Sequence, residues 1–363
     1  MYNYYRIAEL TIQSRFMIES FKGFSCTPAK ADVIIEETRD PAPDCPVNYA
    51  GNLSYRQLPE GWFFSSYRYQ DKGVYVTKDY SQIRVTGAEC DPLADDFEWL
   101  IRVALECWLS LHGFISLHAA AVEVDGKAYA FSGHSGLGKS TRARSWIEAF
   151  CANLISGDRP LINVNATEVY GVPWDGKERC FRDVHYPLGA IFDLRRSNTV
   201  FIRKMSTKQK KALLLRQCFM PMFDTELAII QMVNISKLAK NAVMVRAFCG
   251  PDAKDARALY DALLDHRYLE EDRDMKARTD FVLRNVVDEY ILMPTGNTIG
   301  KFKGTVLLNE VSAFVWEKLQ NPMSKEDLLK AILEEYEVDK ATASADLDAL
   351  LETLRGYGVI EDE

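Results

Sequence analysis

Polarity alternates along much of the first quarter of the chain. Segments such as "RIAELTIQS", "ADVIIEE", "GVYVTKD" and "SQIRVTG" carry apolar side chains at about every second position and are separated by turn-forming residues. A period of two is typical of strands with one buried face. The pattern predicts a β-rich domain over residues 1–94, whose simplest role is packing or oligomerisation, because no chemically reactive side chains cluster there.

The apolar spacing then becomes helical through "FEWLIRVALECWLSLH", which Asp95 or Asp96 can cap and which stops near Gly113. An apolar run "FISLHAAAVEV", a turn, a strand "KAYAFSG", a glycine-rich loop, a helix over residues 140–150 and a strand-like unit "ANLISGDRPLINV" follow. Strand, glycine-rich turn, helix and strand in this order predict an α/β core, here residues 95–270.

The pattern changes again after Pro251. A helical segment "DAKDARALYDALLDH" leads into a charged stretch that is typical of a linker or a solvated helix. From Phe281, the strands "EYILMP" and "TVLLN" precede three helical segments, "EVSAFVWEKLQ", "SKEDLLKAILEEY" and "KATASADLDALLETLRGYG". These elements predict a third domain of α+β type, residues 281–363.

Composition narrows the classes of function. The 363 residues carry a formal net charge of −8 and a pI near 5.4, which disfavours general nucleic-acid binding because that binding needs clustered Lys and Arg. Eight cysteines occur singly, without metal-ligand spacing, as in a protein of the reducing cytosol. We find no signal peptide and no apolar stretch long enough to span a membrane. A soluble cytoplasmic protein is expected.

The strongest chemical signal is "FSGHSGLGKST", residues 131–141, which fits G-x-x-x-x-G-K-[ST]. In such loops the glycines let backbone N–H groups curl around a polyphosphate, and the following helix adds the positive end of its dipole. Lys139 would reach the β and γ phosphates, and the Ser140 hydroxyl would take one position on Mg²⁺. The alternative is a glycine-rich turn that binds nothing.

An acid must complete such a site for phosphoryl transfer. Asp158 follows an apolar strand in "LISGDRP" and is placed for this role. The same aspartate can also simply open a turn before Pro160.

The segments "LHAAAVEVDGKAYAFSGHSGLGKST" and "LISGDRPLI" resemble the core of the HPr kinase and phosphoenolpyruvate-carboxykinase-related P-loop kinases. The resemblance covers about residues 117–162 well and continues more loosely to about residue 250. It implies an HPr kinase-like α/β P-loop kinase fold, with ATP and Mg²⁺ as ligands.

By position, the resemblance implies that His118 lies near the transferred phosphate and that Asp158 serves catalysis and Mg²⁺, with Ser140 as the other metal ligand. It also implies a nucleotide cradle of Gly133, Ser135, Gly136, Leu137, Gly138, Lys139, Ser140 and Thr141. Gly157 stands where the family has a second acid, so Asp158 must serve both roles or another acid must help.

Asp175, in "VYGVPWDGKE", is a candidate for that acid, with Lys177 or Arg182 neutralising charge. That segment also resembles one found in peptide-modifying relatives, although an exposed charged turn explains it equally well. The family's signature of adjacent Glu and Arg near its second glycine-rich segment is not recovered, and "DVHYPLGAIFDL" occupies that region instead. HPr itself is therefore not expected as the acceptor. The chain also lacks the signatures of transporter ATPases and of guanine-binding proteins.

The end of the chain, from "GTVLLNEVSAFVWEKLQ" to "LRGYGVIE", resembles the PqqD-like domain. The matching positions include Asn309, Trp316, the helix start at Ser324 and the closing "GVI". The resemblance implies a winged-helix-like α+β domain that binds the leader of a ribosomally synthesised precursor peptide by adding a strand to a sheet edge. Residues 290–294 and 305–308 are expected to supply that edge.

The combined expectation is an ATP-dependent kinase that phosphorylates a Ser or Thr hydroxyl of a peptide recruited by its C-terminal domain, with Lys139, Asp158, His118 and Asp175 as catalytic residues. Two alternatives remain open: a kinase of a small hydroxylated metabolite, and a non-catalytic peptide chaperone regulated by nucleotide. Neither a nucleic-acid nor a membrane partner is expected, and a homo-oligomer is possible because HPr kinase relatives are often oligomers.

Overall fold

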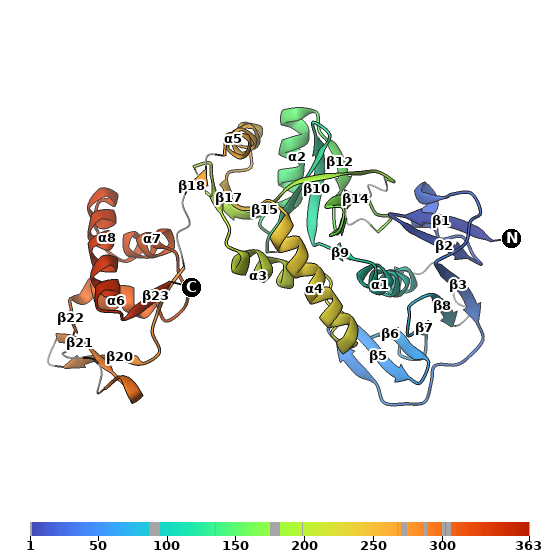
Figure 1. Cartoon of the computed structure of the whole chain (residues 1–363), viewed down its shortest axis with the longest axis horizontal. Helices are drawn as coiled ribbons and strands as arrows, with labels where there is room; N and C mark the ends of the chain where they lie inside the picture. Colours follow the sequence, from blue (N-terminus) through green and yellow to red (C-terminus); the bar gives the residue numbers. More distant parts are fainter. Residues whose placement is uncertain are drawn as a thin grey trace. The chain divides into compact units, whose positions relative to one another are not determined.

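The computed structural model describes residues 2–86, 95–134, 136–174, 182–197, 199–266, 268–269, 274–286, 289–299, 302 and 306–362. The chain forms two compact units, Met1–Leu269 and Glu270–Glu363 (Figure 1). Both units mix helices and strands. Among the helices of the described residues, none combines the length and the hydropathy that a membrane-spanning segment requires.

An eight-stranded sheet forms the start of the first unit, within the described residues 2–86. Its order is β1-β2-β3-β8-β7-β6-β5-β4. The stretch "RIAELTIQS", expected as one strand, is a hairpin, because Ala8 takes a positive φ of 53° and reverses the chain. The bounds are β1 Asn3–Ile7, β2 Leu10–Ser14, β3 Val33–Thr38, β4 Asn48–Ala50, β5 Leu53–Leu58, β6 Gly61–Ser66, β7 Gly73–Thr77 and β8 Gln82–Thr86, with a 3-10 helix η1 at Glu19–Phe24.

Helix α1, Asp95–Leu111, joins this sheet to the rest of the unit. Leu100, Ile101 and Leu105 of the helix pack in one hydrophobic cluster with strand residues such as Phe64 and with Phe223, far along the chain. Residues 1–94 and 95–269 therefore share a core in one compact unit. The division into domains at 1–94, 95–270 and 281–363 stays a prediction.

A second sheet follows, with ten strands in the part of the chain that the structure describes. Its main path is β12-β10-β11-β15-β14-β13-β9, and β17, β16 and β18 continue from the carboxyl half of the long strand β15. The bounds are β9 Phe114–Ser116, β10 Ala119–Val124, β11 Lys127–Ser132, β12 Asn153–Ser156, β13 Leu161–Asn163, β14 Glu168–Tyr170, β15 His185–Arg196, β16 Phe201–Lys204, β17 Met244–Cys249 and β18 Tyr268–Leu269.

Two segments that appeared continuous in the sequence, an apolar run and a strand-like unit, are each divided into two strands. The run "FISLHAAAVEV" becomes β9 and β10, which join different neighbours on either side of His118. The unit "ANLISGDRPLINV" becomes β12 and β13, which are separated by a turn at Gly157 and Asp158. Apolar content alone did not reveal these breaks, because each new strand is as buried as the one before it.

Helices cover both faces of this sheet (Figure 1). On one face, α2 (Lys139–Phe150) and α5 (Ala253–Leu264) bury Trp146 and Leu259 against strand residues such as Phe131. On the other, α3 (Thr207–Gln217) and α4 (Thr225–Asn241) bury Leu214 and Leu238 against residues such as Ala130. Neighbouring residues of β11 thus enter different cores, as the strand period of two requires.

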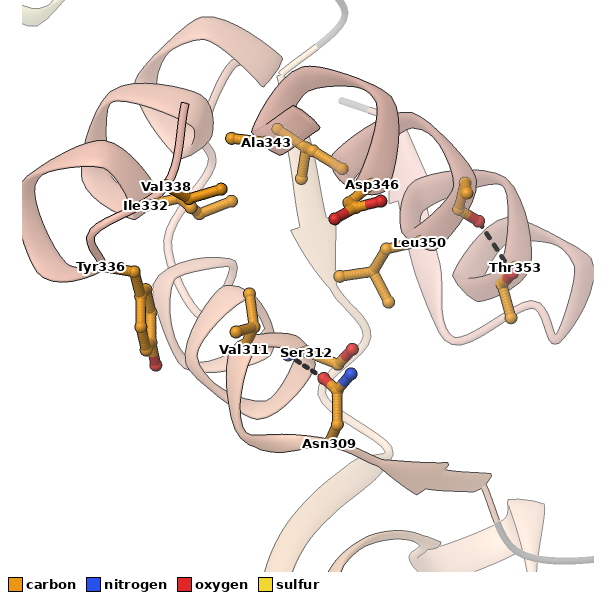
Figure 2. A pocket seen from close by; sticks show the side chains of 12 residues that line it. Asn309, Val311, Ser312, Ile332, Tyr336, Val338, Ala343, Asp346, Leu350 and Thr353 are labelled. Carbon is orange, nitrogen blue, oxygen red and sulfur yellow. Dashed lines mark hydrogen bonds between the residues drawn. The ribbon is translucent and has the colours of Figure 1, made fainter. Parts of the chain in front are cut away.

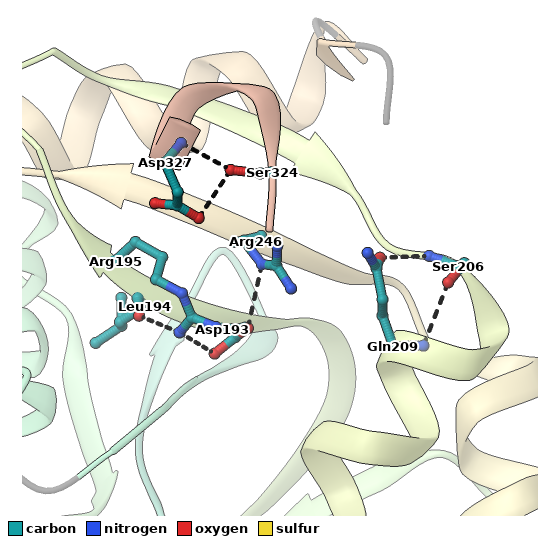
Figure 3. A network of polar contacts seen from close by, with 8 residues as sticks. All are labelled: Asp193, Leu194, Arg195, Ser206, Gln209, Arg246, Ser324 and Asp327. Atoms are coloured by element: carbon teal, nitrogen blue, oxygen red, sulfur yellow. Dashed lines mark hydrogen bonds and ion pairs between the residues drawn. The ribbon is translucent and has the colours of Figure 1, made fainter. Parts of the chain in front are cut away.

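In the described part of the second unit, a three-stranded sheet, β20-β21-β22, and the pair β19-β23 accompany the helices α6, α7 and α8. The bounds are β19 Met275–Ala277, β20 Phe281–Val286, β21 Glu289–Pro294, η2 Gly296–Thr298, β22 Val306–Leu308, α6 Glu310–Lys318, α7 Lys325–Glu335, α8 Lys340–Gly356 and β23 Ile360–Asp362. Trp316, Leu347 and Leu292 lie in its core. The helix start expected at Ser324 is confirmed, since Ser324 caps α7 and its hydroxyl accepts a hydrogen bond from Asp327 N at 3.1 Å (Figure 3).

Candidate functional site

The glycine-rich loop connects the end of β11 to the start of α2. Gly136 and Gly138 take φ values of 82° and 87°, which L-residues with side chains rarely adopt. Gly138 is the N-cap of α2 and offers no side-chain cap. The first N–H groups of α2 are therefore available to an anion, and the positive end of the helix dipole favours one.

Two long side chains of the first unit donate hydrogen bonds to backbone carbonyls of the glycine-rich loop. Lys139 Nζ donates a hydrogen bond to Gly133 O at 3.3 Å, and Arg196 Nη2 donates one to Gly136 O at 2.6 Å. Arg196 ends β15, the parallel neighbour of β11. The loop is thus tied to the strand beside it.

The sheet topology brings three predicted residues to one edge. β10 and β12 pair antiparallel, as do β10 and β11, so the ends of β11 and β12 and the start of β10 coincide. Lys139 follows β11, Asp158 follows β12 and His118 precedes β10. His118 Nε2 lies 3.8 Å from Asp158 Oδ1, and about a third of each side chain is exposed.

Backbone contacts fix the positions of His118 and Asp158. His118 N donates to Gln217 O at 2.7 Å, and Ser132 Oγ donates to His118 O at 3.1 Å. Ser156 Oγ donates to Asp158 O at 2.7 Å. The backbones of His118 and Asp158 are therefore held by hydrogen bonds in the short connections between strands.

The electrostatics of this edge favour an anionic ligand. Burial lowers the pKa of Lys139, with the positive charge of Arg159 acting in the same direction and Asp158 opposing it. Burial and the charge of Lys139 also lower the pKa of His118, against the opposing effect of Asp158. His118 is accordingly neutral near pH 7, with one ring nitrogen able to accept a proton.

We expect His118→Gln to weaken the acid sensitivity of stability. Because the pKa of His118 is lowered in the folded state, the unfolded chain binds more protons as the pH falls below about 6.5, so the wild type loses stability there. Glutamine cannot titrate. The free energy of unfolding, measured with urea at pH 7.5 and pH 5.5, should fall less in the variant; an equal fall in both proteins would contradict the assignment.

The remaining predicted residues divide into two groups. Ser140 and Thr141 lie in the first turn of α2, and Leu137 lies in the loop, while Arg182 is exposed. Ser135, Asp175 and Lys177 lie outside the described residues. In the ranges that the structure describes, no three histidine, cysteine or acidic side chains gather as a metal site.

Sequence reasoning missed Asp193, a buried acid beside the loop strand. Asp193 pairs in register with Ser132 across β15 and β11, and its side chain is 1% exposed. Arg195 Nη1 donates to its Oδ1 at 2.8 Å, and Arg246 Nε lies 3.5 Å from its Oδ2 (Figure 3). The sequence does carry a signal for Asp193, namely an acid directly after the apolar run 190–192, in the same way that Asp158 comes soon after β12.

A cavity of about 220 Å³ adjoins this edge of the sheet. Arg159, the residue after Asp158, contributes to its wall, and Arg102 and Glu106 of α1 bring further charges. Phe219 belongs to the segment that pairs with residues 116–118 beside His118. The full lining is Ala50, Asn52, Leu53, Trp99, Arg102, Val103, Glu106, Arg159, Phe219, Met220 and Phe223.

The second unit offers two features for peptide binding. β21 pairs with both β20 and β22, so the expectation that residues 290–294 supply a sheet edge is wrong. β22 pairs with β21 alone among the described strands, and its Leu307 is 62% exposed. The backbone of residues 306–308 is therefore available to a further strand.

A cavity of about 510 Å³ lies between the helices of this unit (Figure 2). Apolar side chains of α6, α7 and α8 form much of its wall, and Asn309 and Asp346 add polar atoms. The residues that line it are Asn309, Val311, Ser312, Ile332, Tyr336, Val338, Ala343, Asp346, Leu347, Ala349, Leu350 and Thr353. Asn309 directly follows β22, so the cavity begins where the open sheet edge ends.

Comparison with known proteins identifies the C-terminal unit. Residues 289–360 match the family described as Coenzyme PQQ synthesis protein D (PqqD), so the unit contains a PqqD-like domain. No curated protein matches the chain.

Two solved structures are similar to about a quarter of the chain. "TbiB1 in Complex with the TbiA(beta) Leader Peptide" shares 26% identity over 24% of this chain and 94% of that one, with a TM-score of 0.21. "Lasso peptide synthetase B1 complexed with the leader peptide" shares 22% identity over 24% and 98%, also with a TM-score of 0.21. Scores this low support no inference about fold or function.

Proposed function

We propose that the protein is an ATP-dependent kinase that phosphorylates a Ser or Thr hydroxyl of a ribosomally synthesised peptide, recruited through the PqqD-like domain. The observation that carries the proposal is the gathering of His118, Asp158 and Lys139 beside a glycine-rich loop at one sheet edge. The earlier resemblance to HPr kinase-like P-loop kinases supports the same assignment, and the match over residues 289–360 supports a peptide as the partner.

The loop and α2 would bind the polyphosphate. Backbone N–H groups of residues 133–141 would surround it, and Lys139 would exchange its bond to Gly133 O for a phosphate oxygen. The Ser140 hydroxyl and the Asp158 carboxylate are the kind of oxygen donors that Mg²⁺ accepts beside phosphate and water, so these residues would hold it. When bound, Mg²⁺ would neutralise charge on the phosphates.

His118 and Asp158 would handle the acceptor hydroxyl. Its oxygen would form a bond to the γ-phosphorus while the bond from that phosphorus to the bridging oxygen breaks and ADP leaves. The hydroxyl proton would pass to Asp158 or to neutral His118, which lie 3.8 Å apart. With Gly157 in place of the second acid, Asp158 and His118 would share the role of proton acceptor.

The acceptor would approach from the cavity of about 220 Å³, since Arg159 connects that cavity to the catalytic edge. Its apolar walls and its two arginines suit a peptide segment that carries both apolar and acidic side chains. This arrangement would also explain why α1 and the first sheet share a core with the kinase elements.

The PqqD-like domain would hold the leader. The leader would add a strand beside β22, with main-chain hydrogen bonds giving affinity, and would place apolar side chains in the cavity of about 510 Å³. Tethering one part of a peptide raises the effective concentration of the rest at a second site on the same protein. Recognition and chemistry would thus be divided between the two units.

A direct assay tests the proposal. The protein, ATP, Mg²⁺ and the precursor peptide encoded beside its gene are mixed, and mass spectrometry is used to look for one added phosphoryl group. We expect the group on a Ser or Thr side chain outside the leader. Unchanged peptide after full incubation, with ATP shown to bind, would contradict the kinase assignment.

Gly157 favours a second candidate function, a peptide chaperone whose nucleotide site is regulatory. With a single acid after β12, the site would bind ATP without transferring phosphate. The assay separates the two, because a chaperone would change its affinity for the peptide when ATP is present and yet leave the peptide unmodified.

A further inference from the structure

Helix α4 exposes apolar residues as well as burying them. Its inner face holds Leu227, Ile235, Leu238 and Ala239 together with the polar Gln231 and Asn234, which are 0% and 7% exposed. Ile229, Met232 and Val233 are 57%, 51% and 62% exposed, whereas the outer face of a surface helix is normally polar. We call Ile229, Ile230, Met232 and Val233 the α4 stripe.

Hydrogen bonds fix α4 in this orientation. Gln231 Nε2 donates to Phe219 O at 3.1 Å, and Asn234 Nδ2 donates to Ser110 O, at the end of α1, at 2.8 Å. Asn234 also donates to Gln231 Oε1 at 3.1 Å. Turning the helix to bury the stripe would break these buried bonds and would also expose apolar residues that now face the core, such as Leu238.

The exposed residues are contiguous rather than scattered. Ile229, Met232 and Val233 are spaced three and four residues apart, so they lie side by side on the helix surface. Contiguous apolar surface of this kind marks an interaction site on a protein. The stripe therefore needs a partner with an apolar face of similar width.

The charges that flank the stripe indicate which partner fits. Glu226 lies one turn before the stripe and Lys237 one turn after it, and both are exposed. At 100° per residue the two project within about 20° of each other, on the same side of the stripe. Lys237 also donates to Asn165 Oδ1, which leaves other ammonium hydrogens to donate elsewhere.

We propose that the α4 stripe pairs with the α4 stripe of a second copy of this chain, antiparallel about a twofold axis. In an antiparallel pair of identical helices, side chains on the same side of the stripe face each other, so Glu226 of each copy meets Lys237 of the other. A twofold interface requires this self-complementarity. The inference does not depend on the proposed kinase function.

Sedimentation velocity over a range of protein concentrations tests the pairing. We expect a wild-type dimer. Val233→Glu, which places a charge at the centre of the stripe, should raise the dissociation constant of the dimer about 100-fold. Leu264→Glu is the matched control, because Leu264 is similarly exposed at 54% but ends α5; it should leave the dimer intact.

Charge reversal tests the antiparallel register. Glu226→Lys and Lys237→Glu each place like charges opposite one another at positions 226 and 237 of the two copies, so each should raise the dissociation constant of the dimer about tenfold. The double variant should restore the wild-type value. A monomeric wild type, a dimer insensitive to Val233→Glu, or a double variant weaker than both singles would each overturn the proposal. If a different protein or the chain's own second unit covers the stripe instead, the wild-type protein will sediment as a monomer.

Discussion

Lys139→Ala is expected to lower the rate of phosphoryl transfer by roughly 10³-fold, because the variant loses the positive charge nearest the transferred group. Burial already lowers the pKa of this lysine, so its ammonium group is poorly solvated and gains from a phosphate partner. The rate is measured by mass spectrometry of the precursor peptide under single-turnover conditions. ATP affinity, measured by calorimetry, should fall as well.

Lys127→Ala is the matched control for this prediction. Lys127 begins β11, the strand that leads to the loop, and is exposed. It should retain wild-type rate and ATP affinity. Alanine is a strong helix former at the start of α2, so Lys139→Ala should unfold at nearly the wild-type temperature. Transfer that persists in Lys139→Ala would show that the glycine-rich loop does not serve catalysis.

Val311→Asp is expected to weaken binding of the precursor leader by roughly 30-fold, about 2 kcal/mol. The substitution places a carboxylate in the wall of the larger cavity, which the leader would have to cover. Val311 lies in the first turn of α6, where a negative charge agrees with the helix dipole, so the domain should keep its fold. Fluorescence anisotropy of a labelled leader peptide measures the effect.

Tyr357→Asp provides the comparison, since Tyr357 follows α8, is 50% exposed and does not line the cavity. Its leader affinity should equal that of the wild type. In the kinase assay, Val311→Asp should raise the KM of the full precursor and leave kcat nearly unchanged. Equal leader affinity in wild type and Val311→Asp would remove this cavity from the recognition site.

Several features of the candidate site could be predicted because they are local. Three glycines of the loop take positive φ, a preference set by the absence of a side chain. The Ser324 cap depends on a residue three positions away. The segment "KAYAFSG" was predicted as a strand and forms β11, whose neighbouring residues face different cores.

Features that depend on distant partners were missed or misplaced. Asp193 was not recognised, because its role follows from pairing with Ser132 and from Arg246, more than fifty residues further along the chain. Residues 290–294 were expected at a sheet edge but belong to the middle strand β21, because the sequence of a strand does not reveal which strands it pairs with. The HPr kinase-like assignment of the core stays a prediction.

By itself, the sequence determined the glycine loop and the approximate place of many strands and helices, because backbone preference, capping and periodicity act over a few residues. Only the tertiary structure decided which strand ends lie next to each other. It brought His118 to Asp158 through the antiparallel pairing of β10 with β12, and it turned Gln231 and the apolar inner face of α4 toward the core so that the α4 stripe faces outward. Such choices depend on which buried faces and polar groups find partners far along the chain.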